Sequence, residues 1–162
     1  MKYCKKRKKD TEGKIKHKIT EIDNIKFHSA MESRYYLHLK KLKEQGIVKE
    51  FELQPKFLLQ DKFIIVNGEK IEGSNKDFAK IKRKEKAKTI QAIYYISDFK
   101  VTYTNGEIVI VDVKGIKTKE FGIKEKLFKY KYPNLKLEVV IEDKMRGWIS
   151  FDEYKKLKKK GW

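Results

Sequence analysis

An aspartate and a lysine, Asp112 and Lys114, close an apolar run at residues 108–111 in the stretch ISDFKVTYTNGEIVIVDVKG. A continuous apolar run of this kind predicts a strand that is buried on both faces. A carboxylate and an ammonium at its end lie at the edge of a low-dielectric interior, where charges are costly unless they are paired or bind an ion. These two residues are therefore the first candidates for chemistry.

A second carboxylate, Asp98, lies before the turn that leads into this strand, and the turn decides whether the two aspartates meet. A two-residue turn at 105–106 would put Asp98 on the opposite side of the sheet from Asp112. A three-residue loop at 104–106, with its glycine left-handed, would instead put Asp98 directly opposite Asp112. In that register Lys114 shares their face, because side chains two residues apart on a strand point the same way.

Two carboxylates on one face repel, and each raises the pKa of the other unless a cation lies between them. Oxygen ligands without a Cys or His cluster favour Mg²⁺ or Mn²⁺ over zinc. Beside such an ion, Lys114 could orient or help deprotonate an attacking water, or stabilise the charge that develops on phosphorus oxygens. The alternative is an ordinary ion pair at a strand end, between Lys114 and either Asp98 or Asp112.

Three further residues are weaker candidates, and each has a structural alternative. Glu32 stands three residues after Ser29, which is the spacing of a helix capping box. Gln54 precedes a proline and could be a polar residue at a strand bulge. Lys124 lies on the apolar side of a predicted helix, where a lysine has to extend to solvent or reach a polar site.

The pattern of the chain predicts the elements that would position these residues. We expect a hairpin around residues 23–24, a helix over 29–45, a strand over 47–60 broken or bulged at Pro55, and a hairpin turning at 67–68. A long strand over 89–103, the apolar strand over 107–114, a helix from Thr118 to about 130, a strand over 135–142 and a helix from Ser150 follow. This order predicts an α/β (α+β) fold with a mixed sheet and a helix on each face.

Length favours one domain, since 162 residues can bury a core but do not accommodate a separate recognition domain. We divide the chain into a flexible basic arm at residues 1–18 and a single domain at 19–162. Within that domain, a charged insertion spans about 67–88 and is either a loop or a solvated helix.

The chain is strongly basic, with 41 Lys and Arg against 23 Asp and Glu and a formal net charge of +18. A polyanionic partner follows from such a one-sided excess, although genome composition or thermal adaptation can also enrich lysine. The candidate phosphate contacts lie in the arm and in the insertion: Lys5, Lys6, Arg7, Lys80, Lys82, Arg83 and Lys84. The single cysteine leaves no internal disulfide, and no apolar stretch reaches the length of a membrane span, so we expect an intracellular protein.

Taken in order, Glu32, Gln54-Pro55, the YISDF motif around Asp98 and the VDVKG motif around Asp112 and Lys114 resemble the PD-(D/E)XK nuclease superfamily. The resemblance covers about residues 20–142. Within the superfamily the chain is most similar to small phage and prophage nucleases that carry only an unknown-function label. It departs from the common pattern in having Asp112 where many members have Glu, and Ser97 where the pattern has Pro.

The resemblance implies a restriction-endonuclease-like core of helix, three strands, helix and strand. It implies that Glu32, Asp98 and Asp112 are metal-binding residues, that Lys114 is the catalytic lysine, and that the enzyme is a Mg²⁺- or Mn²⁺-dependent DNA endonuclease. Phage relatives of this size suggest branched DNA such as Holliday junctions, cut by a homodimer in the cytoplasm of a bacterial host. The alternatives are a nicking or transposition-type endonuclease and a non-catalytic nucleic-acid-binding module.

Overall fold

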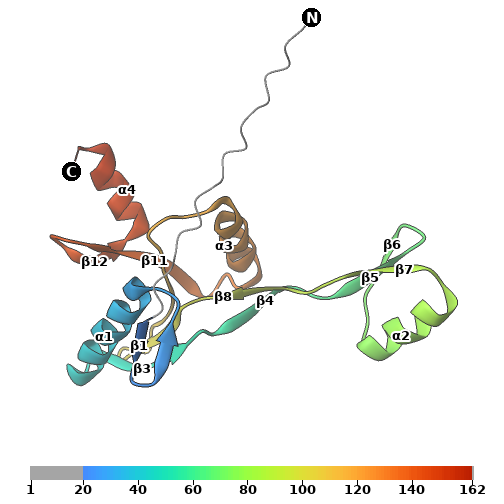
Figure 1. Cartoon of the computed structure of the whole chain (residues 1–162), viewed down its shortest axis with the longest axis horizontal. Coiled ribbons are helices and arrows are strands. Elements are labelled where there is room, and N and C mark those ends of the chain that lie inside the picture. Colours follow the sequence, from blue (N-terminus) through green and yellow to red (C-terminus); the bar gives the residue numbers. More distant parts are fainter. Residues whose placement is uncertain (1–19, 162) are drawn as a thin grey trace, which may run out of the picture.

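The computed structural model describes residues 20–161, and Figure 1 shows a core from which one segment projects far to the side. The helices of this part of the chain are α1 (Ala30–Glu44), α2 (Asn75–Lys84), α3 (Lys119–Lys131) and α4 (Phe151–Lys159). Its strands are β1 (Thr20–Ile22), β2 (Ile25–Phe27), β3 (Val48–Leu53), β4 (Lys56–Gln60), β5 (Phe63–Val66), β6 (Glu69–Ile71), β7 (Ala87–Ile90), β8 (Ile93–Ile96), β9 (Phe99–Tyr103), β10 (Ile108–Val113), β11 (Lys136–Asp143) and β12 (Gly147–Ser150).

The core is built on a five-stranded mixed sheet with the order β12-β11-β10-β9-β3. β10 and β11 are parallel, and the other neighbouring pairs are antiparallel. The parallel pair is possible because α3 crosses between the ends of the two strands. The expected mixed α/β sheet is confirmed.

Helices cover both faces of this sheet, and alternate residues of β10 accordingly lie in two different hydrophobic clusters. One cluster joins α1 to the sheet and includes Tyr35, Tyr36, Leu39, Phe99, Val101, Val109, Val111 and Val113. The other joins α3 and α4 to the opposite face and includes Ile110, Phe121, Phe128, Val139, Ile141 and Phe151. The apolar run therefore marks a strand that is buried on both faces over 109–111, as predicted, although Ile108 at its start is exposed.

The connection between β9 and β10 is the three-residue loop that the sequence left as one of two options. The backbone N–H of Tyr103 donates to the carbonyl of Glu107 at 2.9 Å, and Gly106 has φ 87°. The ladder ends with Phe99 opposite Val111, so the next pair outward is Asp98 and Asp112. The two aspartates are therefore cross-strand neighbours at the end of this ladder, where Asp98 Oδ2 accepts from the Val113 N–H.

Residues 56–96 form the projection seen in Figure 1. β4 and β8 pair at its base, and β6-β5-β7 form a small sheet against which α2 packs. Ile64, Val66 and Phe78 give this distal part a small core of its own. The projecting segment is thus longer than the predicted insertion at 67–88, and its charged part is a helix rather than a loop.

The prediction of one long strand over 89–103 is wrong, because the chain breaks into β7, β8 and β9. The second break lies at Ser97-Asp98, opposite Gln54-Pro55, where Gln54 has a left-handed backbone with φ 50°. Hydrogen bonds bridge the break, from Gln54 N–H to the Asp98 carbonyl at 2.9 Å and from Ser97 N–H to the Pro55 carbonyl at 3.2 Å. The projection is therefore a continuation of the β3–β9 hairpin, turned at a kink.

The sequence reading also missed β12, which follows a polar turn and pairs antiparallel with β11. Its few residues show no clear alternation, so only pairing with β11 reveals it as a strand. Within residues 20–161, no helix combines the length and the apolar character needed to cross a bilayer.

Candidate active site

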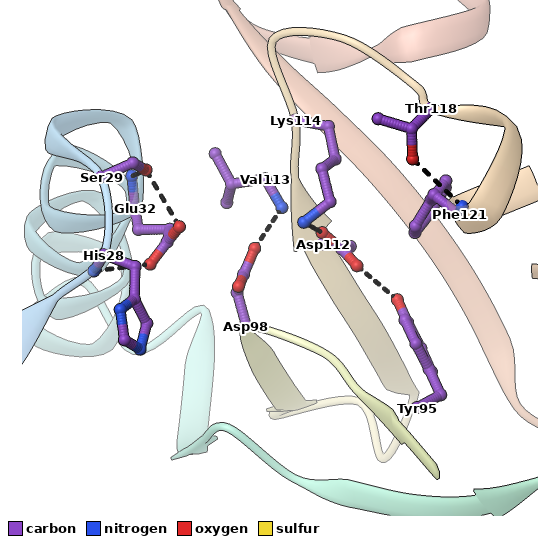
Figure 2. Close-up of polar contacts among 10 residues, drawn as sticks. All are labelled: His28, Ser29, Glu32, Tyr95, Asp98, Asp112, Val113, Lys114, Thr118 and Phe121. Atoms are coloured by element: carbon purple, nitrogen blue, oxygen red, sulfur yellow. Dashed lines mark hydrogen bonds and ion pairs between the residues drawn. The ribbon is translucent and has the colours of Figure 1, made fainter. Parts of the chain in front are cut away.

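Four of the predicted site residues lie at one edge of the core, where three elements end or begin (Figure 2). Asp98 directly precedes β9, Asp112 is the penultimate residue of β10, and Lys114 follows that strand. Glu32 lies in the first turn of α1. Figure 2 shows Asp98 between Glu32 on one side and the pair Asp112 and Lys114 on the other.

Asp112 is the most deeply buried charged residue of the described chain, at 1% exposure. Its Oδ2 accepts a hydrogen bond of 2.6 Å from the hydroxyl of Tyr95. The Nζ of Lys114 lies 2.5 Å from Oδ1, yet no donor in the described residues reaches Oδ1 with hydrogen-bond geometry. One oxygen is thus held in place, and the other is paired only by charge.

Asp98 is partly buried beside this pair, and its Oδ2 accepts a hydrogen bond of 2.7 Å from the backbone N–H of Val113. The pKa of Asp98 is raised to about 8, first by burial and then by the charges of Asp112 and Glu32, although Lys114 and the Val113 N–H lower it. These surroundings favour the protonated, neutral form of the Asp98 carboxyl. A cation at this point would relieve the repulsion.

The ammonium of Lys114 experiences opposing influences. Burial lowers its pKa, but the charges of Asp112 and Asp98 outweigh burial, so the pKa of Lys114 is raised. Its backbone N–H donates to the Val140 carbonyl of β11 at 3.0 Å, which fixes the chain where the side chain leaves. The side chain keeps 32% exposure, so its charge is available to a bound anion.

The raised pKa of Asp98 predicts a pH-dependent stability in the metal-free protein. The folded state keeps the proton up to about pH 8, whereas the unfolded chain releases it near 3.8, so the free energy of unfolding falls as pH rises through this window. The side chain of Asp98→Asn cannot ionise, so the free energy of unfolding of this variant relative to the parent should rise between pH 5 and pH 8. Each pKa unit corresponds to about 1.4 kcal/mol, and because Asp98 is partly exposed the expected rise is reduced to about 2 kcal/mol. Thermal or urea unfolding in EDTA at several pH values measures this.

Asp152→Asn is the matched control, because Asp152 is an exposed aspartate on α4. It should leave the pH profile of unfolding unchanged. An advantage of Asp98→Asn that stays constant from pH 5 to pH 8 would contradict the raised pKa of Asp98.

The Glu32 side chain accepts hydrogen bonds at the N-terminus of α1. Its carboxylate accepts from the backbone N–H of His28 at 3.2 Å and from the hydroxyl of Ser29 at 3.0 Å, and Ser29 in turn accepts from the Glu32 N–H. Ser29 therefore caps α1 as its spacing from Glu32 suggested, but the Glu32 carboxylate takes the backbone N–H of His28 rather than that of Ser29. Glu32 nevertheless remains close enough to Asp98 to raise its pKa.

Gln54 and Lys124 lie in two different hollows that flank the aspartates. Gln54 lines a cavity of about 200 Å³ together with Glu32 and Asp98. Lys124 lines a second cavity of about 280 Å³ together with Asp112 and Lys114, while its Nζ pairs with Glu120 at 2.8 Å. Both accessory candidates thus border the site, one on each side.

The side chains at this edge offer the kind of ligand atoms that a hard divalent cation prefers. They are carboxylate oxygens, and Oδ1 of Asp112, which faces the Lys114 ammonium at 2.5 Å, receives no hydrogen bond of good geometry from the described residues. Among residues 20–161, however, no three Asp, Glu, His or Cys side chains converge into a metal-binding group. The ligand set of Glu32, Asp98 and Asp112 therefore remains a prediction.

Tyr95 is the residue of this site that the sequence reading did not select. It lies on β8 and is 2% exposed, and its ring packs among Phe57, Phe121 and Phe128. Burial, followed by the charge of Asp112, raises the pKa of its hydroxyl, which therefore stays a donor. On a straight strand Tyr95 would face away from Asp98 and Asp112, three residues being an odd step, so periodicity gives no signal for it.

The candidate phosphate contacts divide between described and undescribed parts of the chain. Lys5, Lys6 and Arg7 lie outside the described residues. Lys80, Lys82, Arg83 and Lys84 are exposed on α2 of the projection, and none of them is in an ion pair with a described residue.

Comparison with family models supplies a relationship, but no activity. The model of a family described as "Protein of unknown function (DUF1064)" matches residues 12–146, a range that contains Glu32, Asp98, Asp112 and Lys114. Comparison with the curated proteins and with the solved structures finds no significant match to this chain. Because the family model covers most of its length, the protein belongs to the DUF1064 family.

Proposed function

We propose that this protein is a divalent-metal-dependent endonuclease of the PD-(D/E)XK type that hydrolyses phosphodiester bonds in DNA. The observation that carries the proposal is the pairing of Asp98 with Asp112 at the ends of adjacent strands, beside Lys114. A fold gains nothing from setting two carboxylates against each other at a partly buried edge, since burial and then the charge of Asp112 raise the pKa of Asp98 to about 8. Perturbed groups of this kind are typical of functional sites.

Each residue has a distinct task in this proposal. Asp98 and Asp112 hold Mg²⁺ or Mn²⁺, with Glu32 assisting from α1. When bound, the cation supplies Lewis-acid polarisation of the phosphodiester and counters its negative charge. Lys114 donates hydrogen bonds to the phosphate oxygens or to the attacking water, and its charge stabilises the negative charge that develops during hydrolysis. Gln54 and Lys124 contact the substrate from the two flanking cavities.

The substrate in this proposal is branched DNA of the Holliday-junction kind. Residues 20–161 contain one site edge and one basic projection, and none of their elements forms a separate module for reading a base sequence. Resolving a four-way junction requires two symmetric cuts, so the proposal includes a homodimer. Sedimentation of the protein with and without a junction tests the oligomeric state.

The direct test is incubation of a four-way junction, a linear duplex and supercoiled plasmid with Mg²⁺ or Mn²⁺, with and without EDTA. We expect metal-dependent cleavage, most efficient on the junction and absent in EDTA. Equal cutting of all three substrates would support a less selective endonuclease, with nicking of the plasmid as its mark. A complete absence of cleavage under all conditions would overturn the proposal.

Phosphate contacts from the basic arm and from α2 predict a strong salt dependence of DNA binding. If these cations neutralise about six phosphates, the logarithm of the affinity for duplex arms should fall with the logarithm of salt concentration at a slope near −5. Changing Lys80, Lys82, Arg83 and Lys84 together to Gln should make the slope shallower by about 3. Fluorescence anisotropy between 50 and 300 mM salt, roughly the range over which such contacts weaken, measures both slopes.

A matched variant separates local contacts from total charge. Lys155, Lys156, Lys159 and Lys160, at the C-terminal end of the chain, are also exposed, and changing these four to Gln removes the same charge from α4 and its end. Equal effects of the two variants would show that overall charge, rather than the projection, sets the slope. A parental slope near zero would refute the phosphate contacts altogether.

A second candidate, a non-catalytic nucleic-acid-binding module, is favoured by how completely some of these charges are already satisfied. Glu32 is engaged at the start of α1, and Asp112 has both Tyr95 and Lys114 as partners. Such a module would bind DNA in EDTA as tightly as in metal and would not cut it. The cleavage assay above therefore separates the two candidates.

A further inference from the structure

The hydrogen bond between Tyr95 and Asp112 gives the two oxygens of the Asp112 carboxylate different surroundings. Tyr95 donates to Oδ2 at 2.6 Å, and both side chains are almost fully buried, at 2% and 1% exposure. Oδ1 is paired only with the Lys114 ammonium, at 2.5 Å, and receives no hydrogen bond of good geometry from the described residues (Figure 2). A carboxylate held at one oxygen cannot rotate freely, so the hydroxyl decides which oxygen faces Lys114 and the site.

The position of the hydroxyl is in turn fixed by packing. The Tyr95 ring lies with its centroid 5.4 Å from that of Phe128, 6.2 Å from Phe121 and 6.3 Å from Phe57. These rings come from β4 and from α3, on the face of the sheet opposite α1. The packing of these rings thus fixes the position of the Tyr95 hydroxyl. A carboxylate that is held in place by such a hydrogen bond binds a cation more tightly than a carboxylate that rotates freely.

We propose that Tyr95 is a positioning residue, whose hydroxyl holds the Asp112 carboxylate so that Oδ1 is presented to a divalent cation. The inference rests on the proposed metal-dependent function. It also gives β8 a part in the site, since β8 and β4 form the base of the projection. The strand that carries the projection therefore contributes directly to the geometry of the metal-binding edge.

Tyr95→Phe tests the role of the hydroxyl, because it keeps every ring contact and removes only the donor. Tyr132→Phe is the matched control: Tyr132 belongs to the same aromatic cluster, and its hydroxyl donates to the Leu58 carbonyl at 3.0 Å, away from the aspartates. Mn²⁺ binding without DNA is measured by isothermal titration calorimetry, junction cleavage is measured over a range of Mn²⁺ concentrations, and a thermal melt in EDTA verifies folding.

Tyr95→Phe should weaken Mn²⁺ binding by about 10- to 100-fold, the usual effect of losing a hydrogen bond to a ligating side chain. Its cleavage at low Mn²⁺ should fall in proportion and recover as Mn²⁺ is raised, which a general loss of stability would not produce. Tyr132→Phe should melt at a lower temperature than the parent yet bind Mn²⁺ with parental affinity.

The outcomes separate this inference from the proposed function. A parent that binds Mn²⁺ and cuts junctions, with Tyr95→Phe indistinguishable from it in both assays, would overturn the positioning role alone. Equal losses of Mn²⁺ affinity in Tyr95→Phe and Tyr132→Phe would overturn it as well, because the cluster rather than the hydroxyl would then be responsible. A parent that neither binds Mn²⁺ nor cuts DNA would overturn the proposed function and this inference together.

Discussion

Asp112→Asn should lower the rate of DNA cleavage by about 10³-fold or more while leaving DNA binding intact or slightly tighter. Asn keeps the size of the side chain and an oxygen that can accept the Tyr95 hydrogen bond, but it removes the negative charge at the atom with no other donor. The same change also removes repulsion with the DNA backbone. Cleavage is measured in Mg²⁺, and binding is measured by gel shift in Ca²⁺, with the same junction.

The competing explanation, a structural ion pair, predicts a different set of results for this variant. Removing the charge of Asp112 would then leave Lys114 without its partner at a site where Asp112 is 1% exposed, at a cost of about 3 kcal/mol. The melting temperature and DNA binding would fall together. Asp152→Asn, which alters an exposed aspartate on α4, provides the control for loss of one negative charge. Cleavage by Asp112→Asn at near the parental rate would exclude this site as the nuclease centre.

The pairing of Asp98 with Asp112 could be predicted from the sequence because it depends on local chemistry. The loop at 104–106 contains Asn and Gly, which tolerate a left-handed backbone, and only the three-residue form brings the two carboxylates onto one face. The apolar run at 108–111 likewise identified a strand buried on both faces. What remained was a choice between two loops, and the hydrogen bond from the Tyr103 N–H to the Glu107 carbonyl shows which one the chain adopts.

The Tyr95 contact could not be predicted from the sequence, because it depends on a kink. Periodicity assigns side chains to faces only along a straight strand, and the chain changes direction at Ser97-Asp98, opposite the left-handed Gln54. The expected strand over 89–103 ignored this break, and a straight strand there would have put Tyr95 on the face away from Asp98 and Asp112. Gln54-Pro55 was the available signal, since proline disrupts a strand, but neither residue predicts the direction of the turn.

Glu32 illustrates a different limit, in which one spacing supports two roles. Its place three residues after Ser29 predicts a cap, and its carboxylate indeed accepts from His28 N–H and Ser29 Oγ. The same turn of α1 faces Asp98 across a small cavity, so a carboxylate that caps the helix can also bear on the metal-binding edge. Position along the sequence does not separate the two roles, because both use the first turn of the helix.

Lys114→Ala should reduce the rate of cleavage by about 10²-fold or more and leave Mn²⁺ binding in place. The lysine is not a metal ligand in the proposed site: its ammonium lies 2.5 Å from Asp112 and retains 32% exposure toward an approaching phosphate. Removing it frees Oδ1 of Asp112, so metal affinity should be equal or higher, and the loss should appear in kcat rather than in the metal concentration required.

Two further variants sharpen the Lys114 experiment. Lys114→Arg keeps the positive charge but changes the geometry of its hydrogen-bond donors. A cleavage rate between those of Lys114→Ala and the parent would indicate that the charge contributes. A cleavage rate equal to that of the parent would indicate that the exact position of the donor does not matter. Lys144→Ala removes an exposed lysine from the turn before β12 and should cut DNA at the parental rate. Calorimetry with Mn²⁺ and single-turnover cleavage, measured on all three variants, separate metal binding from the chemical step. A fall in Mn²⁺ affinity that accounts for the whole loss in Lys114→Ala would show that the lysine maintains the shape of the site instead of acting on the substrate.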